Sequence, residues 1–180
     1  MRDKLKIFEW HLYGLSINDY DYVFSMLKDL LKERKIVLGI KRKEIDNKNK
    51  QLKKDKMPFD YTGEEISDLA YYSYLRHVFL WEFGIWRLQG IFEGILNQEF
   101  IKSKRTFGLK SKLDHIISLG FRIDKSNYDE ILEWAKLRNA LSHFPPEQYH
   151  PAQITENDVK QYLSLLKRVT RKLLNQKKNN

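Results

Sequence analysis

The chain has 180 residues and a formal net charge of +9, so nucleic acid is the first class of partner that its composition suggests. It contains no cysteine, which excludes disulfides, thiolate metal sites and thiol nucleophiles. Only 8 glycines and 4 prolines argue against an all-β fold rich in tight turns. Neither a signal-peptide pattern nor an apolar run of the roughly 20 residues that span a bilayer is evident. We therefore expect one cytoplasmic domain, 1–180, with no membrane partner.

The apolar pattern predicts an all-α fold that opens with two long helices. The first runs from Asn18 to about Lys56, and its apolar stripe thins after Ile40, so we expect its far end to project into water. The second begins at a capping box, Thr62–Glu65, in which a threonine is followed by a glutamate three residues later. It continues to about Phe100.

The second helix is apolar on nearly every side between Leu69 and Leu96. That pattern is typical of the central helix of a bundle, or of a helix shared with a partner. Gly84, Gly90 and Gly94 lower helix propensity, so we expect them to be offset by the close approach of neighbouring helices.

Three shorter helices complete the predicted bundle. One spans about 109–119, and the next is capped at Asn127 or the residue before it and ends ahead of Pro145. The last opens at 155–158, where a second threonine-led cap precedes an apolar stripe. The final residues, 176–180, are predicted to be a disordered tail.

The fourth helix ends in the string Arg-Asn-Ala-Leu-Ser-His, 138–143, which groups a guanidinium, a carboxamide and an imidazole. Asn139 and His143 are one turn apart on the same face. Arg138 and His143 are separated by about 140° around an ideal helix, so one helix alone does not aim both at one phosphate. Fraying at His143, or a second copy of the helix from a two-fold partner, would bring the two side chains together.

These side chains suit the cleavage of a phosphodiester. A histidine serves as general acid or base near neutral pH, and an arginine holds a phosphate through two hydrogen bonds and stabilises charge that builds on it. RNA supplies its own nucleophile, the 2′-OH, and internal attack would leave a 2′,3′-cyclic phosphate. No histidine or carboxylate cluster has metal spacing and no cofactor motif is present, so the reaction that we predict needs neither metal nor cofactor.

The motif, with its asparagine directly after the arginine, resembles the Arg-(four to six residues)-His motif of the HEPN superfamily. The resemblance implies a bundle of four or five helices, commonly a homodimer in which two motif copies meet. It also implies that Arg138 and His143 are the ribonuclease residues, with Asn139 as an accessory polar residue. Many members are toxins, defence effectors or RNA-processing ribonucleases, so an antitoxin protein is a further expected partner.

Other candidates are weaker. Glu82 and Glu93 lie on the central helix, where the resemblance implies an accessory acidic or polar residue, and structural ion pairs are the alternative interpretation. Tyr149 follows the motif closely enough to reach the same cleft.

Basic residues gather at two places, and we predict that they bind RNA. Lys53 and Lys54 belong to a lysine-rich stretch at the end of the first helix, and Arg168, Arg171 and Lys172 lie on the last helix. The alternative is that both groups are solvated helix faces.

The sequence therefore predicts a metal-independent endoribonuclease of the HEPN type. Two alternatives remain open, a non-catalytic HEPN domain that binds nucleotides or RNA, and a helical scaffold whose long helices pair with another protein.

Overall fold

The computed structural model describes residues 14–55, 61–101, 108–143 and 153–179. Within these ranges every regular element is helical, and a π-helical turn, Asn97–Ile101, continues the second of the long helices. The α-helices are α2 (Asn18–Lys54), α3 (Tyr61–Leu96), α4 (Leu109–Ser118), α5 (Lys125–His143) and α6 (Glu156–Asn179). The prediction of an all-α bundle with two long helices is confirmed. In this part of the chain, no helix is both long enough and apolar enough to cross a membrane.

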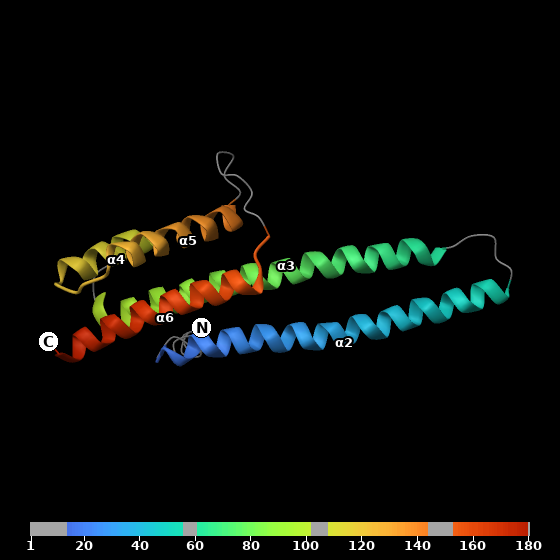
Figure 1. Ribbon diagram of the computed structural model, residues 1–180, viewed down its shortest axis with the longest axis horizontal. Coiled ribbons are helices and arrows are strands. Elements are labelled where there is room, and N and C mark those ends of the chain that lie inside the picture. Colours follow the sequence, from blue (N-terminus) through green and yellow to red (C-terminus); the bar gives the residue numbers. More distant parts are fainter. Residues whose placement is uncertain (1–13, 56–60, 102–107, 144–152, 180) are drawn as a thin grey trace, which may run out of the picture.

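Helix α3 is the centre of the bundle, as the sequence predicted. It packs against α2, α4, α5 and α6, and its C-terminal half supplies much of the core (Figure 1). The fully buried side chains of this half include Trp81, Ile85, Leu88, Phe92 and Ile95. Aromatic and branched apolar side chains on several faces of one helix need neighbours on several sides, and this arrangement provides them.

Helices α2 and α3 run side by side in opposite directions and extend well beyond the other helices (Figure 1). Burial ends at Leu27 on α2, and on α3 it begins only at Trp81. We call the two-helix extension, residues 28–54 and 61–80, the arm. The sequence predicted that α2 would project into water. It did not show that the first half of α3 projects with it.

Helix α6 lies antiparallel to α2. The hydroxyl of buried Tyr20 is 3.0 Å from Oγ1 of Thr170, and near the other end of the contact Lys28 binds Glu156 at 2.8 Å. Since α2 is antiparallel to both α3 and α6, helices α3 and α6 run in the same direction.

Helix α5, which carries the motif, is antiparallel to α6 and therefore also to α3. The Trp134 ring stacks on the Tyr162 ring with centroids 4.9 Å apart, and Arg168 donates to Asn127 Oδ1 at 2.8 Å. The helix begins at Lys125, before either of the two caps that the sequence offered, Ser126 and Asn127.

Of the three glycines that the sequence singled out on α3, Gly84 sits at a close contact with another helix and Gly94 at a close contact with the segment that precedes α2. A Cβ atom at Gly84 would lie 2.8 Å from Cδ1 of Leu27 on α2, and one at Gly94 would collide with Leu15. At Gly90 a Cβ atom would meet nothing within 4 Å. The expectation that all three permit the close approach of a neighbouring helix therefore holds for Gly84, whereas Gly94 makes room for the segment before α2 and the expectation is wrong for Gly90.

The ends of α6 give one confirmation and one correction. Thr155 and Asp158 cap the helix reciprocally, with Thr155 N donating to Asp158 Oδ2 at 2.8 Å and Asp158 N to Thr155 Oγ1 at 3.4 Å. The disordered tail expected at 176–180 is instead helical as far as Asn179. Gln176 fixes this end by exchanging hydrogen bonds of 2.7 and 2.9 Å with the backbone of Arg122.

Candidate functional site

Arg138 lies between α5 and α3, near the C-terminal end of α5. Its guanidinium carbon sits 4.9 Å from the centre of the Trp86 ring of α3, and its Nη1 donates to Oδ1 of Asn139 at 2.8 Å. Its Nε is buried and has no hydrogen-bond partner among the described residues. A cation over an indole face is attracted by about 0.5–1 kcal/mol at a partly exposed site. Arg138 is thus held in one orientation by a ring and an amide.

Asn139 is exposed, and the bond to Arg138 occupies only its amide oxygen. Within the described residues neither its Nδ2 nor the Nη2 of Arg138 has a partner, so both groups can donate to a ligand. Ser142 Oγ donates to the carbonyl oxygen of Arg138, one turn earlier on the same helix, at 2.7 Å. Two adjacent polar residues therefore present nitrogen donors to solvent at the end of α5.

His143 is the last described residue of α5. Its side chain and Tyr149 lie outside the described part of the structure, so the alignment of His143 with Arg138 stays a prediction.

Glu82 lies one turn before Trp86 on α3, so the two side chains leave the helix on the same side. Arg138 is level with Trp86, and α5 is antiparallel to α3. The next turn of α5, which contains Ser142 and His143, therefore falls at the level of Glu82, which is half-buried. Of the two predicted accessory carboxylates, Glu82 is the one in register with the end of the motif.

Glu93 has a structural partner. Its Oε2 accepts a hydrogen bond of 2.5 Å from Nζ of Lys112 on α4, and its Oε1 accepts one of 2.7 Å from Gln89. The Lys112 and Glu93 side chains are only 11% and 18% exposed. The ion pair that the sequence left as the alternative is therefore present for Glu93, where it ties α4 to α3.

Buried polar atoms without partners lie close to this ion pair. The hydroxyl of Tyr162 and Oε1 of Gln89 are both buried and make no hydrogen bond to the residues that the structure describes. Burial raises the pKa of Tyr162, and nearby Tyr20 and Glu93 raise it further, whereas Arg138 acts in the opposite direction.

The basic residues of α6 are mostly engaged within the protein. Lys172 binds Asp124 at 2.7 and 2.8 Å, and this hydrogen bond is the main reason that the pKa of Asp124 falls below its usual value. Arg168 contacts Asn127 and Glu130, and Arg171 is exposed. The partners of Lys172 and Arg168 lie before or in the first turns of α5, at the opposite end of that helix from Arg138.

Lys53 and Lys54 end α2 at the exposed tip of the arm, far from α5 (Figure 1). The predicted RNA-binding residues therefore do not form one surface with the motif. The two groups of basic residues lie at separate ends of the molecule.

Sequence reasoning missed Trp86 as a neighbour of Arg138. Trp86 belonged to the predicted apolar helix, but it is 47% exposed, with Arg138 over its ring. A hint was present, since an aromatic face on a helix that cannot be wholly covered is a usual place for an arginine to stack. The spacing of the residues along the chain does not reveal which arginine does so.

Searches of protein-family models, of curated proteins and of solved structures find no match to this chain.

Proposed function

We propose that this chain is a metal-independent endoribonuclease of the HEPN type, with Arg138, Asn139 and His143 as its site. The observation that carries the proposal is the orientation of Arg138 between Trp86 and Asn139, with nitrogen donors left for a ligand one turn before His143. If Arg138 served only to pack on Trp86, the exposed amide of Asn139 beside it would add nothing. As a site for an anion, the pair gains the amide nitrogen of Asn139 as a further donor.

In the proposed reaction, the imidazole of His143 takes the proton of the 2′-OH, and the 2′-oxygen attacks the adjacent phosphorus. Arg138 and Asn139 donate to the non-bridging oxygens, on which negative charge increases as the new bond forms. The bond from phosphorus to the 5′-oxygen breaks, and that oxygen takes up a proton from solvent, to which the imidazolium of His143 releases its own. The products are a 2′,3′-cyclic phosphate and a 5′-hydroxyl. We assign to Glu82, which is in register with the last turn of α5, the role of orienting the imidazole.

The test is cleavage of a single-stranded RNA in EDTA. Wild type is expected to release a 2′,3′-cyclic phosphate end and to leave DNA of the same sequence intact. His143→Ala and Arg138→Lys are expected to lose at least 100-fold in rate, on the order of one acid–base contribution. The lysine variant keeps the charge but loses the two parallel donors. Equal cleavage of a substrate with a 2′-deoxy residue at the cut site would refute the mechanism.

The chain offers matched controls for both variants. Lys136→Ala removes a cation from the exposed side of the same helix, where Lys136 binds only Glu133. His115→Ala removes a half-exposed histidine from α4. Both variants should cleave at the wild-type rate. If they lose as much activity as the motif variants, the loss reflects general charge or folding, and the assigned site is wrong.

We further propose that the protein is a two-fold homodimer that joins two motif copies. In support, α3 exposes Phe79, Phe83 and Trp86 at 58%, 51% and 47%, on one face beside the motif. Their spacing of four and then three residues is that of a helix–helix seam. A second copy would cover these rings and supply the His143 that one helix does not align with its own Arg138.

Light scattering at micromolar concentration tests the assembly. Phe83→Glu places a charge in the seam and is expected to give a monomer that has lost cleavage. Tyr22→Glu, at a side chain 69% exposed on α2, is the control and should leave the dimer unchanged. A wild-type monomer with full activity would refute both the interface and the shared site.

The long arm favours a second candidate function, a helical scaffold that binds another protein, such as an antitoxin. Its exposed apolar residues include Ile36, Val37 and Ile40 on α2, at 65%, 50% and 53%. Absence of cleavage by wild type, together with tight binding of a partner to the arm, would support this alternative.

A further inference from the structure

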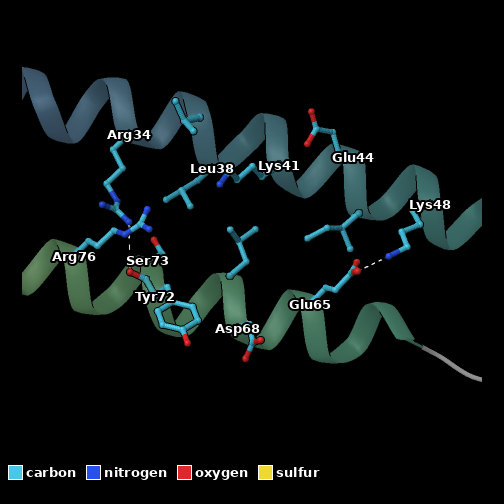
Figure 2. A pocket seen from close by; sticks show the side chains of 13 residues that line it. Arg34, Leu38, Lys41, Glu44, Lys48, Glu65, Asp68, Tyr72, Ser73 and Arg76 are labelled. Atoms are coloured by element: carbon cyan, nitrogen blue, oxygen red, sulfur yellow. Dashed lines mark hydrogen bonds and ion pairs between the residues drawn. The ribbon is translucent and has the colours of Figure 1, made fainter.

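A groove with a cavity volume of about 560 Å³ runs between α2 and α3 in the arm. Figure 2 shows Arg34 of α2 and Arg76 of α3 extending toward each other at one end of it. The same two arginines also border a second hollow of about 500 Å³, together with Glu33, Phe79 and Leu80. Two cations therefore face each other where two concave surfaces meet.

Neither guanidinium has a counterion within the described residues. Arg34 donates only a long bond of 3.5 Å, from Nη2 to the carbonyl oxygen of Tyr72, and its Nε is buried without any partner. Burial lowers the pKa of Arg34, and the positive charge of Arg76 lowers it further. Holding the positive charges of Arg34 and Arg76 close together raises the free energy of the folded protein, and an anion bound between them would offset this repulsion.

The acids of the groove lie away from this pair. Glu65 is bound to Lys48, and Figure 2 shows both, together with Asp68 and Glu44, toward the other end of the groove. The groove is therefore positive at its inner end, nearer the bundle, and mixed at its outer end.

We propose that Arg34 and Arg76 form a phosphate-binding site in the arm. Guanidinium groups bind phosphate oxygens through paired N–H donors, and two of them match a phosphomonoester dianion or the phosphates of a nucleic acid strand. Tyr72, one turn before Arg76, is 55% exposed and offers a ring on which a base could stack. The hydroxyl of Ser73, which also lines the groove, is a further donor.

The site is separate from the motif at the end of α5, and the proposal does not depend on RNA cleavage. The probes are AMP and a single-stranded oligonucleotide with 2′-O-methyl groups and a 5′-hydroxyl, which internal attack cannot cleave. Adenosine is the probe without phosphate. Binding is measured by calorimetry at low salt on the full chain, with wild type compared to Arg34→Gln and Arg76→Gln.

Each variant is expected to weaken binding of a phosphate-bearing probe at least 10-fold, and adenosine is expected not to bind. Arg42→Gln is the matched control because it removes the same charge from α2 at an exposed position outside the groove, and it should weaken binding less than twofold. Melting in phosphate-free buffer checks the fold. Arg76→Gln should melt at or above the temperature of wild type, since one of two repelling charges is gone.

Binding of AMP would identify a phosphomonoester as the ligand, and binding of the oligonucleotide alone would identify the backbone of a strand. Both results support the site if they depend on Arg34 and Arg76. The proposal is overturned if wild type binds neither probe, or if Arg42→Gln weakens binding as much as Arg76→Gln. Cleavage by the motif can fail without changing any of these outcomes.

Discussion

Two glycines on the same helix should respond in opposite ways to the same substitution. Replacing glycine by alanine within a helix gains about 1 kcal/mol of helix propensity. At Gly90, where the new methyl group meets nothing within 4 Å, that gain should appear almost undiminished. We expect Gly90→Ala to raise the free energy of unfolding by about 0.5–1 kcal/mol and the melting temperature by about 2–3 °C.

At Gly84 the same methyl group enters the contact of α3 with α2 and α6. It would lie 2.8 Å from Cδ1 of Leu27 and 3.4 Å from Cγ1 of Val159, closer than the ~3.5–4.0 Å optimum for two carbons. Leu27 and Val159 are both fully buried, so neither can turn outward. Overpacking of this kind costs about 1–3 kcal/mol, which cancels or outweighs the gain in propensity. Gly84→Ala should therefore change stability by between about 0 and −2 kcal/mol.

Denaturant melts followed by circular dichroism, at one protein concentration, measure both variants. The separation between them should be about 1–3 kcal/mol, with Gly90→Ala the more stable. Equal stabilisation by the two substitutions would show that α2 and α6 do not approach α3 at Gly84 as the structure describes. The arm and the bundle would then need a different packing of α3.

Two further predictions test buried polar groups. Tyr162→Phe should leave the melting temperature unchanged or raise it, because the hydroxyl that it removes has no partner, whereas Tyr20→Phe breaks a 3.0 Å bond to buried Thr170 and should cost about 1–2 kcal/mol. A larger loss for Tyr162→Phe than for Tyr20→Phe would mean that the Tyr162 hydroxyl is bonded after all. Glu93→Gln should lower the free energy of unfolding by about 2–4 kcal/mol, because it removes the counterion of Lys112, whose side chain is only 11% exposed. Adding Lys112→Met to this variant should restore most of the lost stability. A coupling near zero in that double-mutant cycle would place the pair in the class of weak surface ion pairs.

The positions of the helices follow from local sequence. The apolar stripe of α2, the cap at Thr155 and the dense apolar pattern of α3 each arise from residues within a few turns, and the structure has helices where these patterns predict them. Helix ends were less accurate. The tail beyond Gln176 is helical because the side chain of Gln176 binds the backbone of Arg122. These two residues are 54 positions apart in the sequence, so no local pattern contains the contact.

For the candidate site, the sequence determined which groups are present, and the tertiary structure decided which of them meet. The motif 138–143 was recognisable as a string, and its place at the end of α5 followed from periodicity. That Trp86 lies under Arg138 depends on the register between two helices, which is fixed by packing over the whole bundle. Glu93 pairs with Lys112 for the same reason.

The arm shows the same division. Composition alone showed an excess of positive charge, and the thinning of the apolar stripe on α2 predicted that this helix leaves the core. Only the antiparallel pairing of α2 with α3 brings Arg34 beside Arg76, residues that are 42 positions apart in the sequence and that no periodicity relates. Periodicity sets the face of a helix on which a side chain lies, but the partner across that face is set by the side-chain packing that fixes helix register.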